Sequence, residues 1–213
     1  MIALPLLILI PSLILNVVLL RNRPVTPAGV RVIGVIDGDT IMLLGKEKVR
    51  LRYVDAPEVE LCGSEQATKE LTSLELGKTV QIEETIPDQY GRGMALVYDG
   101  DTLINKYMVA SDWVQYHSDS SSQTEVIKAV GVAAKSERLG IFGLCQSTVN
   151  TKHPECNIKG NIDQNKSTNN HKYYIPGCAQ YPFTIVEEDI GEQWFCTEKE
   201  AQVAGFMKAD TCK

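Results

Sequence analysis

Five short apolar segments between residues 30 and 99 constrain the fold of this chain more than any other feature. They read VRVIGVI, TIMLL, KVRLRYV, KTVQIEE and GMALVYD, and each ends at Gly, Asp or Pro. Segments of this length, rich in apolar and β-branched residues, are typical of antiparallel strands. The GKE tripeptide at 45–47 favours a hairpin turn between two of them. Five such strands are enough for a small closed barrel.

Three longer segments have the period of amphipathic helices. In SEQATKELTSLELG, Ser64 is the expected N-cap and Gly77 the expected stop. TLINKYMVASDW is the second segment. In the third, SQTEVIKAVGVAAKSERLG, Val126 and Val130 are expected on the apolar face. The order of strands and helices predicts an α+β fold with a five-stranded barrel and three helices, which we place at 30–147.

The chain begins with an apolar run, MIALPLLILIPSLILNVVLL, which predicts a hydrophobic helix within residues 1–21. About twenty helical residues cover the ~30 Å hydrocarbon core of a bilayer. Because no Lys or Arg precedes the run and no clear cleavage site follows it, we favour a transmembrane anchor over a cleaved signal segment. The linker 22–29 follows. Arg21 and Arg23 favour a cytoplasmic position for the remainder, whereas six cysteines favour an oxidising compartment. We expect an extracytoplasmic protein, membrane-anchored or secreted.

The net charge of −6 at pH 7 excludes a broad basic surface. Non-specific affinity for nucleic acid comes from Lys and Arg side chains that neutralise phosphates. If this chain handles a polynucleotide, it therefore does so through a local basic site and a bound cation.

Two neighbouring segments, VIDGDT and VRLRYVDAPE, concentrate acidic side chains around an arginine. Carboxylates from adjacent strands can bind Ca²⁺ or Mg²⁺ and leave open positions for water and a phosphate. An arginine adds paired donors for phosphate oxygens, and a carboxylate that is not a ligand can accept a proton from water. From the spacing alone, a purely structural explanation is as good as a functional one, because Asp-Gly is common in turns and Pro57 can end a strand. Asp37 in particular is expected to form a turn. The candidates for chemistry are Asp39, Arg50, Asp55 and Glu58.

A third segment, DQYGRGMALVY, places Arg92 between two glycines before a strand. In order and separation, IDGDT, VRLRYVDAPE and DQYGRGMALVY resemble the thermonuclease family, the staphylococcal nuclease-like domains. The resemblance covers about residues 30–145 and includes LINKYMV and KSERLGIFG. It implies an OB-fold and hydrolysis of DNA or RNA phosphodiesters with Ca²⁺ as cofactor.

The resemblance also implies a role for each matching position. Two carboxylates and one main-chain oxygen bind calcium, two arginines bind the phosphate and stabilise the five-coordinate transition state, a glutamate is the general base, and a tyrosine contacts substrate. The bond to the 5′ oxygen breaks. Asp39, Asp55 and Ala56 match the metal ligands. Arg50, Glu58 and Arg92 match the catalytic residues, and Tyr90 matches the tyrosine that contacts substrate.

Two departures from the family pattern affect the site. Ala56 stands where threonine is usual, but a main-chain ligand needs no hydroxyl group. A tyrosine pair that packs on the terminal nucleotide has no clear counterpart, because the region DWVQYHSDSSSQTE is shorter by about three residues. Tyr116 and His117 are candidates to replace the pair, although an exposed loop histidine is more often a bystander.

After residue 147, Asn, Gln, Lys and aromatic residues become more frequent and the aliphatic periodicity fades. A linker at 148–155 leads to a small module at 156–213, which contains four cysteines. A core of this size usually needs disulfides or a metal. The module resembles a sunset domain, and its second half is similar to the zinc-binding Ada fold. Because only two of the four zinc-ligand positions are cysteines here, we expect that zinc binding is lost. These four positions are occupied by Tyr174, Cys178, Ala209 and Cys212.

We expect disulfides in place of zinc. Of the three possible connectivities in the module, we favour Cys156 with Cys196 and Cys178 with Cys212. Cys62 and Cys145 either pair, which ties the Glu58 loop to the end of the barrel segment, or are two unrelated buried thiols.

These inferences predict a nuclease, of endonuclease type, that uses Ca²⁺ and acts on DNA, RNA or both. The chief alternative is a non-catalytic OB-fold module that binds nucleic acid or protein at the cell surface. That alternative gives no chemical reason to keep two acids, a base and two arginines together. The sequence indicates no protein partner, and we expect a monomer associated with the membrane through its N-terminal segment.

Overall fold

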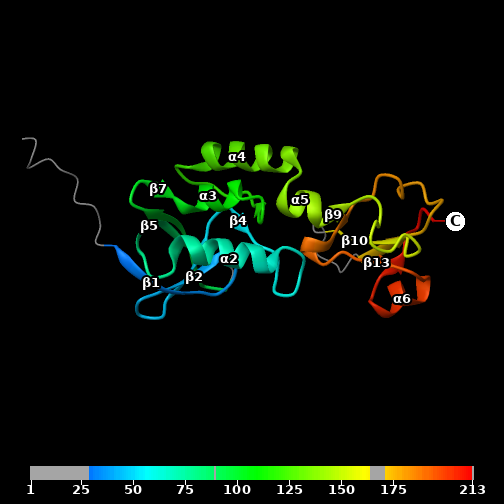
Figure 1. Cartoon of the computed structure of the whole chain (residues 1–213), viewed down its shortest axis with the longest axis horizontal. Coiled ribbons are helices and arrows are strands. Elements are labelled where there is room, and N and C mark those ends of the chain that lie inside the picture. Colours follow the sequence, from blue (N-terminus) through cyan, green and yellow to red (C-terminus); the bar gives the residue numbers. More distant parts are fainter. Residues whose placement is uncertain (1–28, 89, 164–170, 213) are drawn as a thin grey trace, which may run out of the picture.

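The computed structural model describes residues 29–88, 90–163 and 171–212. The elements lie in two lobes, the first with most of the strands and the long helices and the second with the C-terminal elements (Figure 1). The predicted N-terminal helix lies outside the described residues. Among the helices that are described, none is long and apolar enough to cross a membrane.

Five strands of the first lobe pair in a circuit. The order is β3-β2-β1-β5-β6, and β6 pairs in parallel with β3, so the two ends of this series meet. All five predicted segments form these strands. Their bounds are β1 (Val30–Val35), β2 (Thr40–Leu43), β3 (Lys48–Leu51), β5 (Thr79–Pro87) and β6 (Gly93–Asp99).

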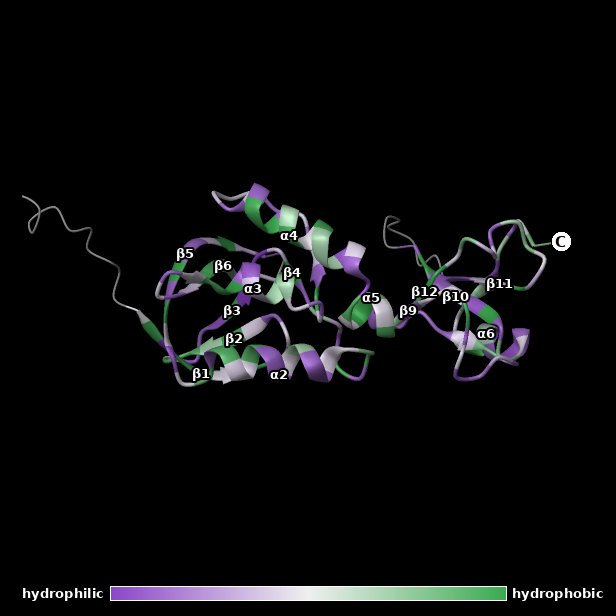
Figure 2. Ribbon diagram, turned by 45° about the horizontal axis from the view of Figure 1, so that its top comes forward, coloured by the Kyte–Doolittle hydropathy of each residue, from purple (hydrophilic) through white to green (hydrophobic). Residues whose placement is uncertain are grey.

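Short strands and helices complete the first lobe, so that the predicted α+β class is confirmed. The helices contribute buried apolar side chains to the same core as the strands, among them Leu71, Met108 and Ile127. Figure 2 shows hydrophobic and hydrophilic positions mixed along α2 and α4. The remaining elements of this lobe are β4 (Val54–Asp55), α2 (Ser64–Glu75), β7 (Thr102–Leu103), α3 (Ile104–Ala110), β8 (Gln115–Tyr116), α4 (Thr124–Glu137) and α5 (Gly140–Leu144).

The helices of the first lobe differ from prediction in number and in two details. Four are present among the described residues, because α5 begins at Gly140, where the third and last helix was predicted to end. The N-cap of α2 is Gly63 rather than Ser64, because the chain takes a left-handed turn there with φ of 90°. A Cβ at this position would lie 2.6 Å from Ile141, so only glycine fits. In α4 the buried face contains Ile127, one position away from the predicted apolar face. Val126, which was predicted on that face, is 46% exposed.

The second lobe has a sheet in the order β13-β10-β11-β14 and its own small apolar core around Tyr173 and Phe195. Both disulfides predicted for this part are present, Cys156–Cys196 and Cys178–Cys212. The resemblance to sunset and Ada domains stays a prediction. The elements are β10 (Ile158–Ile162), β11 (His171–Tyr174), β13 (Trp194–Phe195), α6 (Glu198–Val203) and β14 (Met207–Lys208).

The two lobes are joined by a short antiparallel pair. β9 (Gln146–Ser147) follows the first lobe and pairs with β12 (Val186–Glu187) of the second, which runs into the 3₁₀ turn η1 (Glu188–Ile190). Of the two alternatives for Cys62 and Cys145, the disulfide is present, and it ties the loop before α2 to the residue before β9. The two lobes therefore meet close to the loop that carries Glu58.

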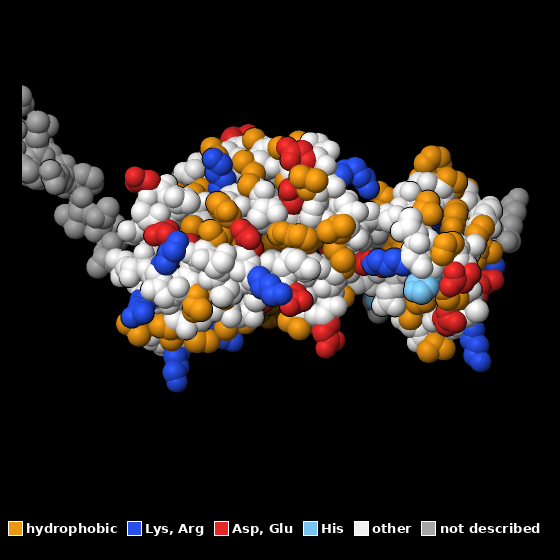
Figure 3. Space-filling model, in the orientation of Figure 1, with side chains coloured by type: hydrophobic (Ala, Val, Ile, Leu, Met, Phe, Trp, Pro, Cys, Tyr) orange, Lys and Arg blue, Asp and Glu red, His pale blue; other side chains and the backbone are white. Residues whose placement is uncertain are grey.

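The face drawn in Figure 3 has its Lys and Arg side chains at separate places, with acidic side chains between them. This distribution agrees with the negative net charge of the chain. On this face, any site for a polyanion must therefore be local.

Candidate active site

The turn between β1 and β2 places Asp39 at the site. Asp37 accepts a hydrogen bond from the backbone N–H of Asp39 at 3.0 Å, which confirms its predicted role as a turn former. Gly38 between them lies so close to α2 that an added Cβ would be 2.4 Å from Cβ of Ala67. Asp39 is only 3% exposed as a result, and Thr40 donates to its Oδ1 at 2.7 Å.

Arg50 joins the two acids predicted to bind metal. Its Nη2 lies 2.8 Å from Oδ2 of Asp39 and 2.7 Å from Oδ1 of Asp55. Arg50 is opposite Thr40 in the β2–β3 ladder, so sheet register brings it next to Asp39. The structure thus brings these three residues together, with two carboxylate oxygens converging on one point.

The carboxyl group of Asp39 has a strongly altered environment. Burial raises its pKa to about 7, Arg50 acts in the opposite direction, and the charge of Asp37 adds to the rise. A buried carboxylate is stabilised in its charged form only by a nearby cation and hydrogen bonds. Asp39 is therefore a group that binds positive charge strongly.

Asp55 is more exposed and comes from the two-residue strand β4. Next to it, the backbone N–H of Ala56 donates to Oδ2 of Asp39 at 3.3 Å. β4 pairs with β8, in which Gln115 lies opposite Asp55 and Tyr116 opposite Val54. The position of Asp55 thus depends on β8 as well as on its own segment.

Arg92 is held by an acid that the sequence analysis did not assign. Nε of Arg92 donates to Oδ2 of Asp88 at 2.7 Å, and the backbone N–H groups of Arg92 and Tyr90 donate to Oδ1 at 2.8 Å. Asp88 raises the pKa of the guanidinium further, so Arg92 is a permanent cation. The Tyr90 side chain is 75% exposed, with its ring 5.4 Å from the guanidinium carbon.

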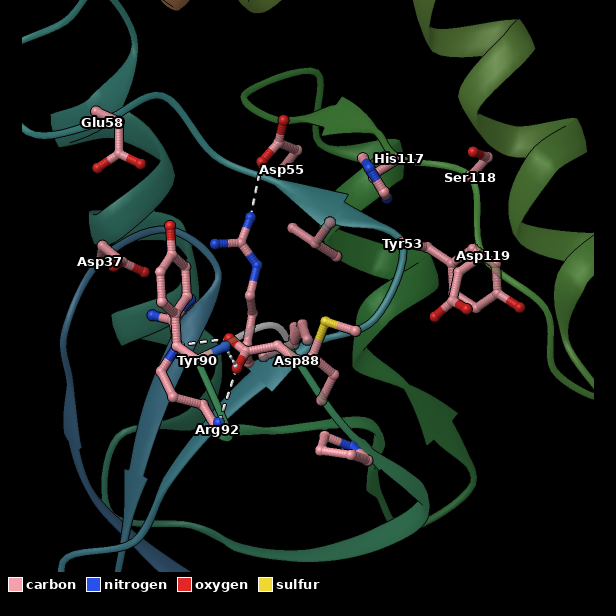
Figure 4. Close-up of a pocket in the computed structure, with 15 residues that line it drawn as sticks. Asp37, Tyr53, Asp55, Glu58, Asp88, Tyr90, Arg92, His117, Ser118 and Asp119 are labelled. Carbon is pink, nitrogen blue, oxygen red and sulfur yellow. Dashed lines mark hydrogen bonds and ion pairs between the residues drawn. The ribbon is translucent and has the colours of Figure 1, made fainter. Parts of the chain in front are cut away.

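The predicted residues line one open cavity of about 850 Å³, which includes Arg50, Asp55, Glu58, Tyr90 and Arg92. Figure 4 shows Asp37 and Glu58 on one side of it, His117 and Ser118 on the other, and Tyr90 and Arg92 beside Asp88. Asp39 lies just beneath, in contact with Arg50. Every predicted catalytic side chain therefore faces the same space.

The two candidates for the missing tyrosine pair differ in position. Tyr116 stacks on the buried Tyr53 with ring centroids 6.1 Å apart, and Gly131 leaves the room for it on α4. His117 lines the cavity, with its backbone N–H donating to the carbonyl of Tyr53 at 2.9 Å. Tyr116 is therefore part of the core, and only His117 is placed to meet a ligand.

An ion pair between Arg52 and Asp119, which the sequence did not predict, supports the wall of the cavity. Arg52 is 3% exposed and binds Asp119 through Nε at 2.6 Å and through Nη2 at 2.9 Å. Asp119 is 67 positions away, so no local pattern reveals the pair. This ion pair fixes the segment 117–119 along the wall of the cavity.

Within the described ranges, no cluster of three or more His, Cys, Asp or Glu side chains is arranged to hold a metal ion. The donors at this place are two carboxylates, Asp39 and Asp55, joined by a guanidinium. Any further ligands would have to be main-chain oxygens or water, as is common for Ca²⁺.

Comparisons with known proteins point to one enzyme family. The sequence profile described as "Staphylococcal nuclease homologue" matches residues 48–143. A protein of Escherichia coli O157:H7 named "Uncharacterized endonuclease" is 36% identical over 120 residues, which cover 53% of this chain and 75% of that protein. A protein of Haemophilus influenzae with the same name is 37% identical over 83 residues, 37% of this chain and 47% of that protein. "Micrococcal nuclease" of Shigella flexneri is 36% identical over 70 residues, 32% of this chain and 40% of that protein.

Proposed function

The chain belongs to the staphylococcal nuclease homologue family and is a nuclease, and from this premise we propose that it hydrolyses phosphodiester bonds of DNA, RNA or both with the help of Ca²⁺. The observation that carries the proposal is the contact of one Arg50 nitrogen with both Asp39 and Asp55 in a cavity that also holds Glu58 and Arg92.

The acids fit a calcium ion. Oδ2 of Asp39 and Oδ1 of Asp55 lie 2.8 and 2.7 Å from a single point, the Nη2 position, and Ca²⁺ binds oxygen ligands at about 2.3–2.6 Å. Hard oxygen donors of this kind suit calcium, and the main-chain oxygen of Ala56 is the third ligand that we propose. When bound, the ion offsets the charge of the phosphate and polarises it.

The arginines bind the phosphate. A guanidinium has five N–H donors. A calcium ion between the two acids would displace Nη2 of Arg50 from them, which frees the donors of this group for phosphate oxygens, while Arg92 keeps donors beside its Nε contact with Asp88. Both groups line the cavity, so they are close to the charge that develops on the phosphate. One such donor contributes about 2.7–4 kcal/mol in comparable sites.

Glu58 accepts the proton of the attacking water, and Tyr90 contacts the substrate. Glu58 is exposed at the edge of the cavity, where water and a nucleic acid strand both have access. Geometry within reach of the reacting water is the first requirement for a general base. The leaving group that we propose is the 5′ oxygen, which leaves a 3′-phosphate on the product.

We further propose that the five paired strands form a closed OB barrel. We also propose that the protein is a monomer and that it is located outside the cytoplasm, either attached to the membrane or secreted. Three disulfides support the compartment, because such bonds persist in oxidising surroundings. The apolar N-terminal run supports the membrane attachment.

A digestion assay tests the function. Full-length protein in a mild detergent is incubated with single-stranded DNA or RNA and millimolar Ca²⁺, with EGTA as the metal-free arm. We expect cleavage with Ca²⁺, loss of cleavage with EGTA, and a large loss of rate in Glu58→Gln. Glu60→Gln is the matched control, because Glu60 is an exposed acid of the same loop that does not line the cavity. Equal rates in both variants would contradict the role of Glu58.

A further inference from the structure

The strand that carries Asp55 receives support from the second lobe. β4 has two residues, and it pairs with the equally short β8, where Gln115 lies directly opposite Asp55. Directly opposed residues in an antiparallel pair have Cβ atoms about 4.5–5.5 Å apart. A shift of Gln115 therefore moves Asp55 as well.

Asp189 of the second lobe binds the side chain of Gln115. Nε2 of Gln115 donates to Oδ2 of Asp189 at 2.7 Å, and Nε2 of Gln146 donates to both oxygens at 3.2 Å. Asp189 is 1% exposed, and Gln146 is buried too. A buried carboxylate with two amide donors is a costly group to disturb, because each donor left without an acceptor loses a hydrogen bond that water cannot readily replace.

Asp189 is in turn fixed to the first lobe. It lies in η1, directly after the β12 strand that pairs with β9, and the backbone N–H of Glu188 donates to the carbonyl of Cys145 at 2.8 Å. Cys145 is bonded to Cys62. The carboxylate of Asp189 is thus a rigid point against which Gln115 and β8 are held.

We propose that Asp189 is a positioning residue for the calcium site, acting through Gln115 and the β8–β4 pair to hold Asp55 in place. This inference rests on the proposed function in one respect, the binding of calcium by Asp55. It gives the second lobe a role in the reaction, since Asp189 of that lobe accepts the hydrogen bond of the Gln115 side chain. Asp189 touches neither metal nor substrate.

The test compares variants of the full-length protein in detergent. Calcium affinity is measured by calorimetry, and amide hydrogen exchange of β4 and β8 is measured without metal. For Asp189→Ala and Gln115→Ala we expect calcium binding weakened about fivefold, less than the 10–100-fold typical of a group bonded to a ligand, together with faster exchange in both strands. Asp189→Asn keeps one carbonyl acceptor and should recover part of both effects. The double variant should be no worse than either single one, because the two residues act as a unit.

Glu198→Ala is the control. Glu198 accepts a hydrogen bond from Tyr173 at 2.7 Å and pairs with Lys208 at 3.3 Å, both within the second lobe, so its loss should leave calcium affinity and exchange in β4 and β8 unchanged. Folded Asp189→Ala with parental affinity and parental exchange would overturn the proposal. If the parent protein binds no calcium, the proposed function fails, yet faster exchange of β4 and β8 in Asp189→Ala would still support the positioning and unchanged exchange would overturn it.

Discussion

Nη2 of Arg50 lies 2.8 Å from Oδ2 of the buried Asp39. The guanidinium therefore occupies the place to which a cation is attracted, and it compensates the charge of an acid that burial would otherwise neutralise. Experiments can separate the contact of Arg50 with the two acids from the role toward the phosphate that we propose for it.

The first prediction concerns Arg50→Ala. Cleavage should fall by about 100- to 1,000-fold, the loss typical of one donor to a developing charge. Removal of the guanidinium also leaves Asp39 and Asp55 without their partner, so added Ca²⁺ should raise the melting temperature more in this variant than in the parent. Thermal unfolding with and without Ca²⁺ measures this difference, and an equal rise in both proteins would speak against a shared site.

The second prediction concerns Arg92→Ala. We expect a loss of cleavage rate of about 100-fold or more with little change in stability, because the Arg92 side chain is 37% exposed and Asp88 keeps two backbone N–H donors when the guanidinium is removed. Arg31→Ala is the control, since Arg31 is an exposed arginine on β1 away from the cavity. Digestion by Arg92→Ala at the rate of the Arg31 variant would remove Arg92 from the mechanism.

The third prediction concerns Asp88, which holds Arg92 in position. Asp88→Ala removes the acceptor for three N–H groups, so Arg92 becomes mobile while its charge remains. Cleavage should fall by about tenfold, less than in Arg92→Ala. A double variant that is no slower than Arg92→Ala alone would show that Asp88 acts through the arginine, whereas independent, additive losses would refute that role.

The fourth prediction uses pH. The side chain of Glu75 on α2 is fully buried, neither carboxylate oxygen has a hydrogen-bond partner among the described residues, and burial raises its pKa from 4.5 to about 7. Between pH 4.5 and about 7, the folded protein therefore keeps a proton on Glu75 that the unfolded chain releases. The contribution of protonated Glu75 to the free energy of unfolding is complete below pH 4.5 and is lost as the pH rises through 7. The loss amounts to no more than about 3 kcal/mol.

Glu75→Gln should therefore raise the melting temperature at pH 8 and change it little at pH 4.5. Glu70→Gln on the same helix is the control for removal of a charge. Denaturation curves of both variants across this pH range make the comparison, and a Glu75 variant that gains the same stability at both pH values would show that the carboxyl group does not titrate in this way.

Local patterns predicted much of this structure. Strand segments with alternating or continuous apolar residues were located correctly because these strands bury one face, as Val32 and Ile41 do. The carboxylates of VIDGDT and VRLRYVDAPE were expected to meet because their strands are neighbours in the chain. The glycine in IDGDT has a reason visible only in the structure, the close approach of α2 to Gly38.

The misses have a common physical cause, which is long-range contact. The pair Arg52–Asp119 and the hydrogen bond Gln115–Asp189 join residues 67 and 74 positions apart, and no periodicity encodes them. Asn105, for which we made no prediction from the sequence, is buried; it accepts a hydrogen bond from the N–H of Val97 and donates to the carbonyls of Arg52 and Ala95. Such polar contacts depend on which segments the fold brings together.

Calorimetric titration with Ca²⁺ decides whether Asp39 and Asp55 bind one calcium ion. We expect the parent to bind one ion and Asp39→Asn and Asp55→Asn each to lose most of this binding, while Asp101→Asn, a change at an exposed acid in the turn before β7, binds as the parent does. Unchanged calcium binding in both site variants, with the folded state intact, would show that this pair of acids does not hold the ion.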